Sequence, residues 1–65
     1  MKDWEVYLLR AASARAEADA AVLKNVRQRC LRSEAAWSEM AARAERTEQM
    51  RAERESEKAS MHAET

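Results

Sequence analysis

Few side chains in this sequence have types that support chemistry, and they lie far apart along it. There is one cysteine, Cys30, and one histidine, His62. A zinc site needs about four ligands, which one Cys and one His do not supply. The sequence also has no glycine-rich phosphate loop and no nucleophile elbow, the usual local signs of phosphate binding and of a serine hydrolase. We therefore expect no catalytic residues, no metal, no cofactor and no enzyme activity.

Cys30 has two interpretations. It is either a small apolar side chain in a packed helix seam or a redox-active thiol. Arg27, Arg29 and Arg32 lie near it in the sequence, and neighbouring positive charge stabilises an exposed thiolate. In a parallel homodimer two Cys30 side chains would also face each other. We favour the packed seam, and a thiol switch at Cys30 stays open as an alternative function.

Residues 20–33 carry four basic side chains and no acidic one, and we call these four the basic waist: Lys24, Arg27, Arg29 and Arg32. Clustered Arg and Lys bind phosphate groups, so a small nucleic-acid-associated regulator is a second alternative. The formal net charge of the chain is zero, whereas nucleic-acid-binding domains are usually strongly basic. We therefore rank nucleic acid below a protein partner.

The composition predicts an all-α protein. The 65 residues include no Gly and no Pro but 15 Ala, and Ala, Arg, Glu, Leu and Met are the residues that favour helices. No run approaches 18 consecutive apolar residues, so no membrane span is expected. A single free thiol fits a reducing compartment, and the predicted location is cytoplasmic.

Two apolar stripes follow helical spacing. The first contains Trp4, Leu8, Ala11, Ala14, Ala18 and Val22. The second is spaced 4-3-4-3-4-3, as in the a/d seam of a heptad repeat, and contains Val26, Cys30, Ser33, Trp37, Met40, Ala44 and Thr47. The two stripes are out of phase near Asn25, so the chain either turns there or continues as one helix through a stutter.

We predict a turn, because Asn25 followed by Gln28 resembles a capping box. The absence of a Gly to end the first helix is the counter-argument. The predicted hairpin has helices near residues 3–23, with Asp3 as the N-cap, and 26–55. Residues 1–55 form a single domain, and residues 56–65 form a charged tail that is frayed or disordered. The alternative is one long helix in a coiled-coil dimer or trimer.

Large apolar side chains are too few for a lone chain. Burying each contributes roughly 1.5–3 kcal/mol, whereas ordering each residue costs roughly 1.5 kcal/mol. We therefore predict self-association into an antiparallel four-helix bundle, with a dimer as the favoured oligomer, or binding to a helical protein partner. The predicted interface residues are Trp4, Leu8, Val22, Val26, Cys30, Trp37, Met40 and Ala44. The expected function is a non-enzymatic oligomerisation or protein–protein interaction module of unspecified cellular role.

Overall fold

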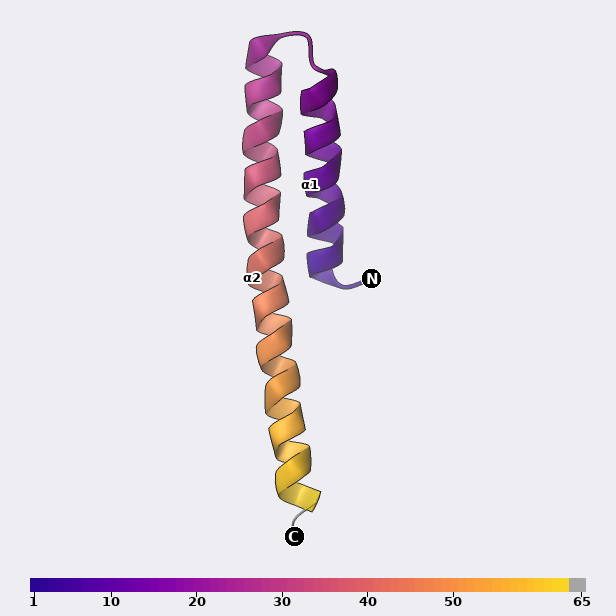
Figure 1. The fold of residues 1–65 in the computed structure, drawn as a ribbon, viewed down its shortest axis with the longest axis vertical. Helices are drawn as coiled ribbons and strands as arrows, with labels where there is room; N and C mark the ends of the chain where they lie inside the picture. The colour runs from indigo at the N-terminus through magenta and orange to yellow at the C-terminus, as the bar shows by residue number, and fades with distance from the viewer. Residues whose placement is uncertain (64–65) are drawn as a thin grey trace.

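The computed structural model describes residues 1–63, which form a helical hairpin. Helix α1 spans Asp3–Ala20 and helix α2 spans Lys24–Ala63, and residues 21–23 connect them. The helices lie side by side and run antiparallel (Figure 1). The predicted all-α hairpin is confirmed, and the alternative of one continuous helix is wrong.

The turn lies earlier than the sequence indicated. Helix α1 ends at Ala20 because Ala21 adopts an extended backbone (φ −71°, ψ 131°). None of the residues that the structure describes has a positive φ, so the chain turns without the left-handed conformation that favours Gly. Asn25 lies within the first turn of α2, and the predicted capping box is therefore wrong. Leu23 precedes α2, and its carbonyl accepts a hydrogen bond from the Arg27 amide at 3.0 Å.

The beginning of α1 also differs from the prediction by one residue. Lys2, not Asp3, is the N-cap: its backbone is extended and its side chain makes no capping hydrogen bond. The Lys2 carbonyl accepts from the amides of Glu5 and Val6 at 3.0 and 3.2 Å. Asp3 and Glu5 lie in the first helical turn, where their negative charge still favours the positive end of the helix dipole.

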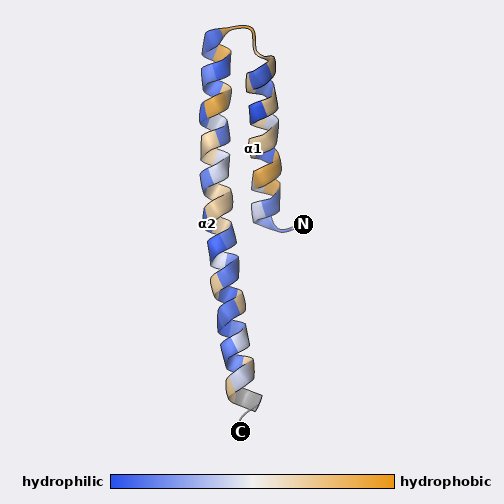
Figure 2. Ribbon diagram, in the orientation of Figure 1, coloured by the Kyte–Doolittle hydropathy of each residue, from blue (hydrophilic) through white to orange (hydrophobic). Residues whose placement is uncertain are grey.

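Helix α2 continues well past the predicted end near residue 55, to Ala63. Residues 52–63 are mostly Ala, Arg, Glu, Lys and Met, which have high helix propensity. The hydrophilic colour of this extension in Figure 2 agrees with the predicted charged tail. Residues 64–65 of that tail lie outside the described residues, and its fraying in solution stays a prediction.

The interior of the hairpin consists of alanine. The buried residues are Ala11, Ala14, Ala18 and Ala41, with exposed fractions of 7%, 8%, 1% and 2%. Among the residues that the structure describes, no large side chain is fully buried. The Cα radius of gyration is 17.9 Å, against about 11 Å for a compact domain of this length. The hairpin is therefore a thin rod with a single seam instead of a domain with a core.

Leucine at a buried alanine of this seam should destabilise the hairpin. Ala18→Leu and Ala41→Leu insert side chains where the two backbones approach, and overpacking typically costs ~1–3 kcal/mol. The measurement is urea unfolding followed by circular dichroism. The control is Ala16→Leu on the exposed face of α1, which should change stability by less than about 0.5 kcal/mol. Unfolding of Ala18→Leu at the wild-type urea concentration would contradict the alanine seam.

Candidate functional site

The seam between the helices is the only extensive contact surface within residues 1–63. Most of the less exposed residues of α1 repeat at intervals of three and four: Trp4, Tyr7, Ala11, Ala14 and Ala18. Most of those of α2 repeat in the same way: Cys30, Glu34, Trp37, Ala41, Ala44 and Glu48. Glu5, Val6 and Ser33 are also half-buried. Small residues alternate with a few large ones on both helices, which lets the backbones lie close together.

Half of the predicted interface residues lie in this seam. Trp4, Cys30, Trp37 and Ala44 are half-buried between the helices. The other four are exposed to solvent: Leu8 at 46%, Val22 at 92%, Val26 at 39% and Met40 at 39%. The sequence stripes were therefore correct in period and at most of their alanine and tryptophan positions, but wrong at individual large side chains. Tyr7 takes the place of Leu8, and Ala41 takes the place of Met40.

The size of the side chains explains why Leu8 and Met40 lie outside the seam. An alanine seam lets two helices pack closely, whereas Leu8 and Met40 would hold them apart. Tyr7, Ala41 and Glu34 were not among the predicted interface residues. The alanine spacing Ala11, Ala14, Ala18 was the signal that marks the contacting face of α1. The matching signal on α2 is Ala41 followed by Ala44.

Trp37 makes the main aromatic contact across the seam. Its ring stacks with Tyr7 of α1, with centroids 5.8 Å apart and planes inclined by 30°. The Arg10 guanidinium carbon lies 5.8 Å from the centroid of the same ring. An aromatic pair of this kind contributes about 0.5–1.5 kcal/mol beyond area burial, and an exposed cation–π contact about 0.5–1 kcal/mol. Trp37 therefore fixes the axial position of α1 along α2.

Charged pairs bridge the helices on either side of the alanines. The Arg15 guanidinium lies 3.7 Å from Glu34 of α2 and 3.3 Å from Asp19 of its own helix. Lys2 donates a hydrogen bond to Glu48, which Arg51 approaches at 3.9 Å. Exposed ion pairs typically contribute less than about 1 kcal/mol. These contacts favour the observed register more than they add stability.

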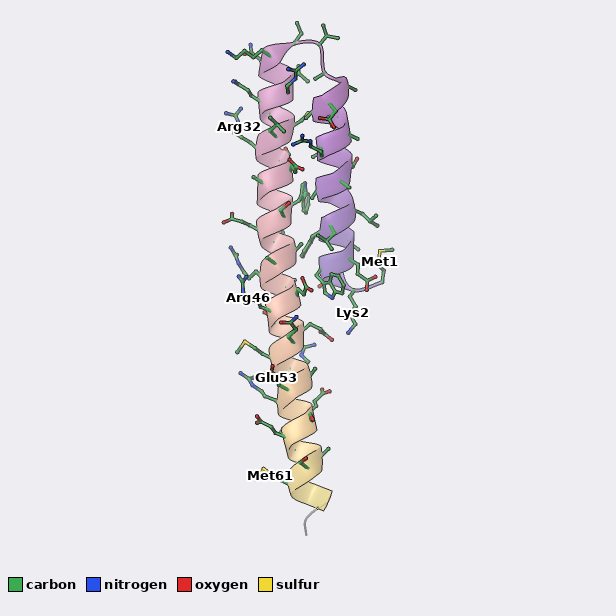
Figure 3. All side chains as sticks on the ribbon, in the orientation of Figure 1. Met1, Lys2, Arg32, Arg46, Glu53 and Met61 are labelled. Atoms are coloured by element: carbon green, nitrogen blue, oxygen red, sulfur yellow. The ribbon has the colours of Figure 1, made fainter. Side chains whose placement is uncertain are left out.

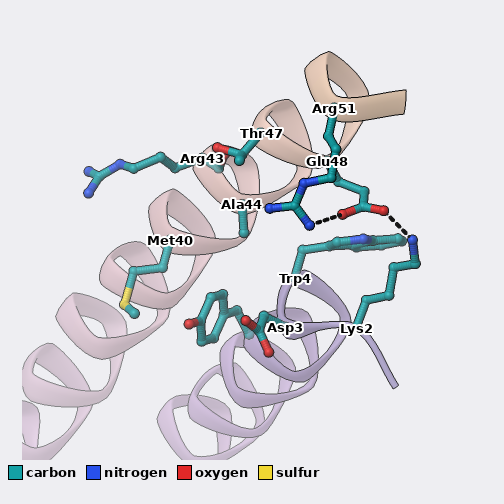
Figure 4. A pocket seen from close by; sticks show the side chains of 10 residues that line it. Lys2, Asp3, Trp4, Met40, Arg43, Ala44, Thr47, Glu48 and Arg51 are labelled. Carbon is teal, nitrogen blue, oxygen red and sulfur yellow. Dashed lines mark hydrogen bonds and ion pairs between the residues drawn. The ribbon is translucent and has the colours of Figure 1, made fainter. Parts of the chain in front are cut away.

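A pocket of about 390 Å³ opens at the end of the seam near the N-terminus (Figure 4). Its apolar wall comes from Trp4, Tyr7, Met40 and Ala44, and its charged rim includes Lys2, Arg43, Glu48 and Arg51. Asp3 and Thr47 complete the lining. No nucleophile lies beside a general base here. The pocket has the chemistry to hold an apolar side chain of a partner within a ring of mixed charge.

The Cys30 thiol lies beside an acidic side chain of the other helix. Its Sγ donates to the Glu17 carboxylate at 3.9 Å. Arg27 turns toward the connection and donates from Nη2 to the Ala21 carbonyl at 3.0 Å. The antiparallel packing of α1 produces the Cys30 contact, because it brings Glu17 across from Cys30.

The basic waist lies at the end of the hairpin where the helices connect. Lys24, Arg27, Arg29 and Arg32 are all exposed on the first turns of α2. Arg32 points away from α1 in Figure 3, whereas Arg27 reaches the connection. The four cations therefore surround α2 instead of forming one flat patch.

The described residues contain no evident metal site and no helix suited to cross a bilayer. No group of three His, Cys, Asp or Glu within them could hold a metal ion. No helix in residues 1–63 is both long and apolar enough for a membrane span.

The Lys2–Glu48 contact predicts a measurable titration. The hydrogen bond from Lys2, together with its charge, holds the pKa of Glu48 below the ordinary value of 4.5, and Arg51 lowers it slightly further. Because the folded-state pKa is depressed, this contribution to stability is present above pH 4.5 and is lost as the pH falls through the folded-state pKa. NMR titration of Lys2→Gln should show the Glu48 pKa moving up toward 4.5, with a smaller rise in Arg51→Gln. An unchanged Glu48 pKa in Lys2→Gln would refute the contact.

Comparison with known proteins gives no relative for this chain. Neither a protein-family model, nor a curated protein, nor a solved structure matches it.

Proposed function

We propose that this protein is a non-enzymatic helical interaction module that self-associates into an antiparallel four-helix bundle. The observation that carries the proposal is the alanine seam, whose buried residues are Ala11, Ala14, Ala18 and Ala41. Four methyl groups bury little apolar area, and helical domains this small usually need additional stabilisation from a partner. A second copy of the chain supplies that missing area.

The large apolar side chains outside the seam support the need for a partner. Those exposed by at least a third within the described residues are Met1, Leu8, Leu9, Val22, Leu23, Val26, Leu31, Met40, Met50 and Met61. Single exposed apolar residues are normal on protein surfaces. Here, however, they make up most of the large apolar groups of the chain, which is unusual for a stable monomer.

The length of α2 supports the same conclusion. Helix α1 reaches α2 only as far as the Lys2–Glu48 contact, and residues 49–63 extend beyond it (Figure 1). An isolated helical segment of about 15 residues is marginal in water. Pairing with the α2 of a second chain would stabilise this extension.

Exposed positions on α2 indicate the face that pairs. Val26, Ser33, Met40 and Thr47 repeat every seven residues, beside the seam that faces α1. Val26, Met40 and Thr47 of this row are exposed, Val26 and Met40 at 39% each, whereas Ser33 is half-buried. This row fits a coiled-coil contact with another α2.

The charge distribution favours antiparallel pairing of the two α2 helices. Residues 20–33, which contain the basic waist, include no acidic residue, whereas residues 45–57 contain five Glu and three Arg. Antiparallel helices place the basic end of one chain near the acidic end of the other. Parallel helices would bring the two basic waists together, and like-charge contacts of this kind are unfavourable.

Light scattering coupled to size-exclusion chromatography, at two protein concentrations, tests the proposal. We expect the mass of a dimer, with helicity by circular dichroism that falls when dilution separates the chains. Met40→Lys should give a monomer, because it places a charge in the pairing row. Leu9→Lys is the matched control on another exposed face and should remain dimeric. A stably folded wild-type monomer would exclude the proposed function.

Trp37→Ala should weaken the hairpin and, through it, the assembly. The substitution removes the Tyr7 stack and the Arg10 contact. Truncating a fully buried Trp costs about 3–5 kcal/mol, and we expect about 2–3 kcal/mol because this ring is half-buried. Thermal melting followed by circular dichroism measures the loss, with Leu9→Ala as the exposed control. A melting temperature equal to wild type would show that Trp37 does not anchor the seam.

The two alternative functions draw less support from the structure. Nucleic-acid binding by the basic waist stays a prediction, and its four cations surround α2 instead of converging. Absence of DNA and RNA binding at ~50 mM salt would exclude a nucleic-acid-binding function, because phosphate-driven binding is strongest at low salt. A thiol switch at Cys30 also stays a prediction.

A further inference from the structure

The apex of the hairpin carries apolar side chains that the fold does not use. Val22 is 92% exposed and Leu23 is 67% exposed, and both lie in the connection between the helices. Turns generally contain Gly, Pro, Asn, Asp or Ser, which suit tight backbone geometry and remain solvated. Figure 2 shows hydrophobic colour running over the whole connection. Neither the turn nor the seam explains two large apolar groups at this position.

Positive charge lies directly behind these two residues. Lys24 is the first residue of α2, and Arg27 and Arg29 follow on its first turns. The Arg27 guanidinium is held at the apex by its hydrogen bond to the Ala21 carbonyl. The nearest acid in sequence, Asp19, is paired with Arg15 at 3.3 Å. The apex therefore combines two exposed apolar side chains with several basic side chains close behind them.

We propose that the apex docks onto a membrane surface that contains anionic lipids. Val22 and Leu23 enter the boundary between headgroups and acyl chains, where apolar groups of surface-bound proteins reside. Lys24 directly follows them, and Arg27 and Arg29 lie one to two helical turns further along α2, at the level of the lipid phosphates. The complementary charge of an anionic headgroup layer is what identifies this occupant.

The shape of the apex favours a lipid surface over a protein. The apex is the convex end of a rod whose Cα extents are 64 × 16 × 11 Å. The pocket lined by Trp4 and Tyr7 lies near the N-terminus, at the other end of the seam. A protein partner would need a preformed hole of matching shape. A fluid bilayer accommodates two small apolar side chains without a preformed cavity.

The expected affinity comes from a few groups. Burial of one Leu or Val side chain corresponds to about tenfold to a hundredfold in a binding constant. Each cation near an anionic bilayer adds about fivefold. Binding should therefore be weak but measurable, reversible, and dependent on both the apolar groups and the charges.

Vesicle sedimentation with the full chain tests this inference. Vesicles of phosphatidylcholine alone are compared with vesicles that also contain phosphatidylserine, at low salt and at ~1 M salt, where the Debye length is about 3 Å. We expect binding only to the phosphatidylserine vesicles at low salt. Leu23→Ser should weaken it at least about tenfold, and Lys24→Gln about fivefold.

The variants are chosen so that unfolding does not imitate loss of binding. Ser at position 23, which precedes α2, supplies a capping hydroxyl, so Leu23→Ser should keep or raise helicity. Leu9→Ser is the matched control, since Leu9 is 58% exposed on α1 away from the apex, and it should bind vesicles like wild type. Light scattering on each variant reports self-association separately from vesicle binding.

Two results would overturn the docking. One is no binding of the wild-type chain to phosphatidylserine vesicles at low salt. The other is equal vesicle binding by wild type and by the Val22→Ser, Leu23→Ser double variant. A change in oligomeric mass in that double variant without vesicle binding would assign the apex to a protein contact instead. Binding of duplex DNA without vesicle binding would assign the cations to nucleic acid.

Discussion

The close approach of two alanine-lined helix faces is the constraint on which the rest of the hairpin depends. Ala18 and Ala41 are nearly inaccessible, and each leaves only a methyl group between the backbones. Such a seam admits few large side chains, so most of them must lie elsewhere. The exceptions are Trp4, Tyr7 and Trp37, which lie toward the open end of the seam and determine how α1 sits along α2.

This constraint divides the surface of the molecule into parts with different roles. Close packing uses the alanines, and it leaves Val26 and Met40 on the flank of α2 as a row for another helix. It also leaves Val22 and Leu23 at the apex with the basic waist behind them. The proposed self-association and the proposed membrane contact thus use different apolar side chains, although both draw on the positive charge of the basic waist. Each can fail without the other.

The sequence predicted the hairpin and its helical periods but misplaced details that depend on fine geometry. The phase break near Asn25 correctly indicated two helices, whereas the turn itself lies at residues 21–23. An extended Ala21 was enough to end α1, and no sequence rule distinguishes that residue from its Ala neighbours. Helix α2 also ends later than predicted, at Ala63, because the charged residues beyond position 55 favour helix.

Composition and spacing alone determined that this chain is helical, that it has two amphipathic stretches, and that it has too few large apolar side chains to form a core. Those conclusions depend on local propensity and on counting apolar groups, which are properties of the sequence. Only the tertiary structure decided that Tyr7 and Ala41, and not their neighbours Leu8 and Met40, face the other helix, because adjacent residues fit the same period almost equally well. It also decided that Glu17 lies across from Cys30, and that a basic segment from the middle of the sequence surrounds one end of the hairpin. Contacts between residues far apart in sequence depend on the antiparallel register, and steric fit at Ala18, Trp37 and Ala41 sets that register.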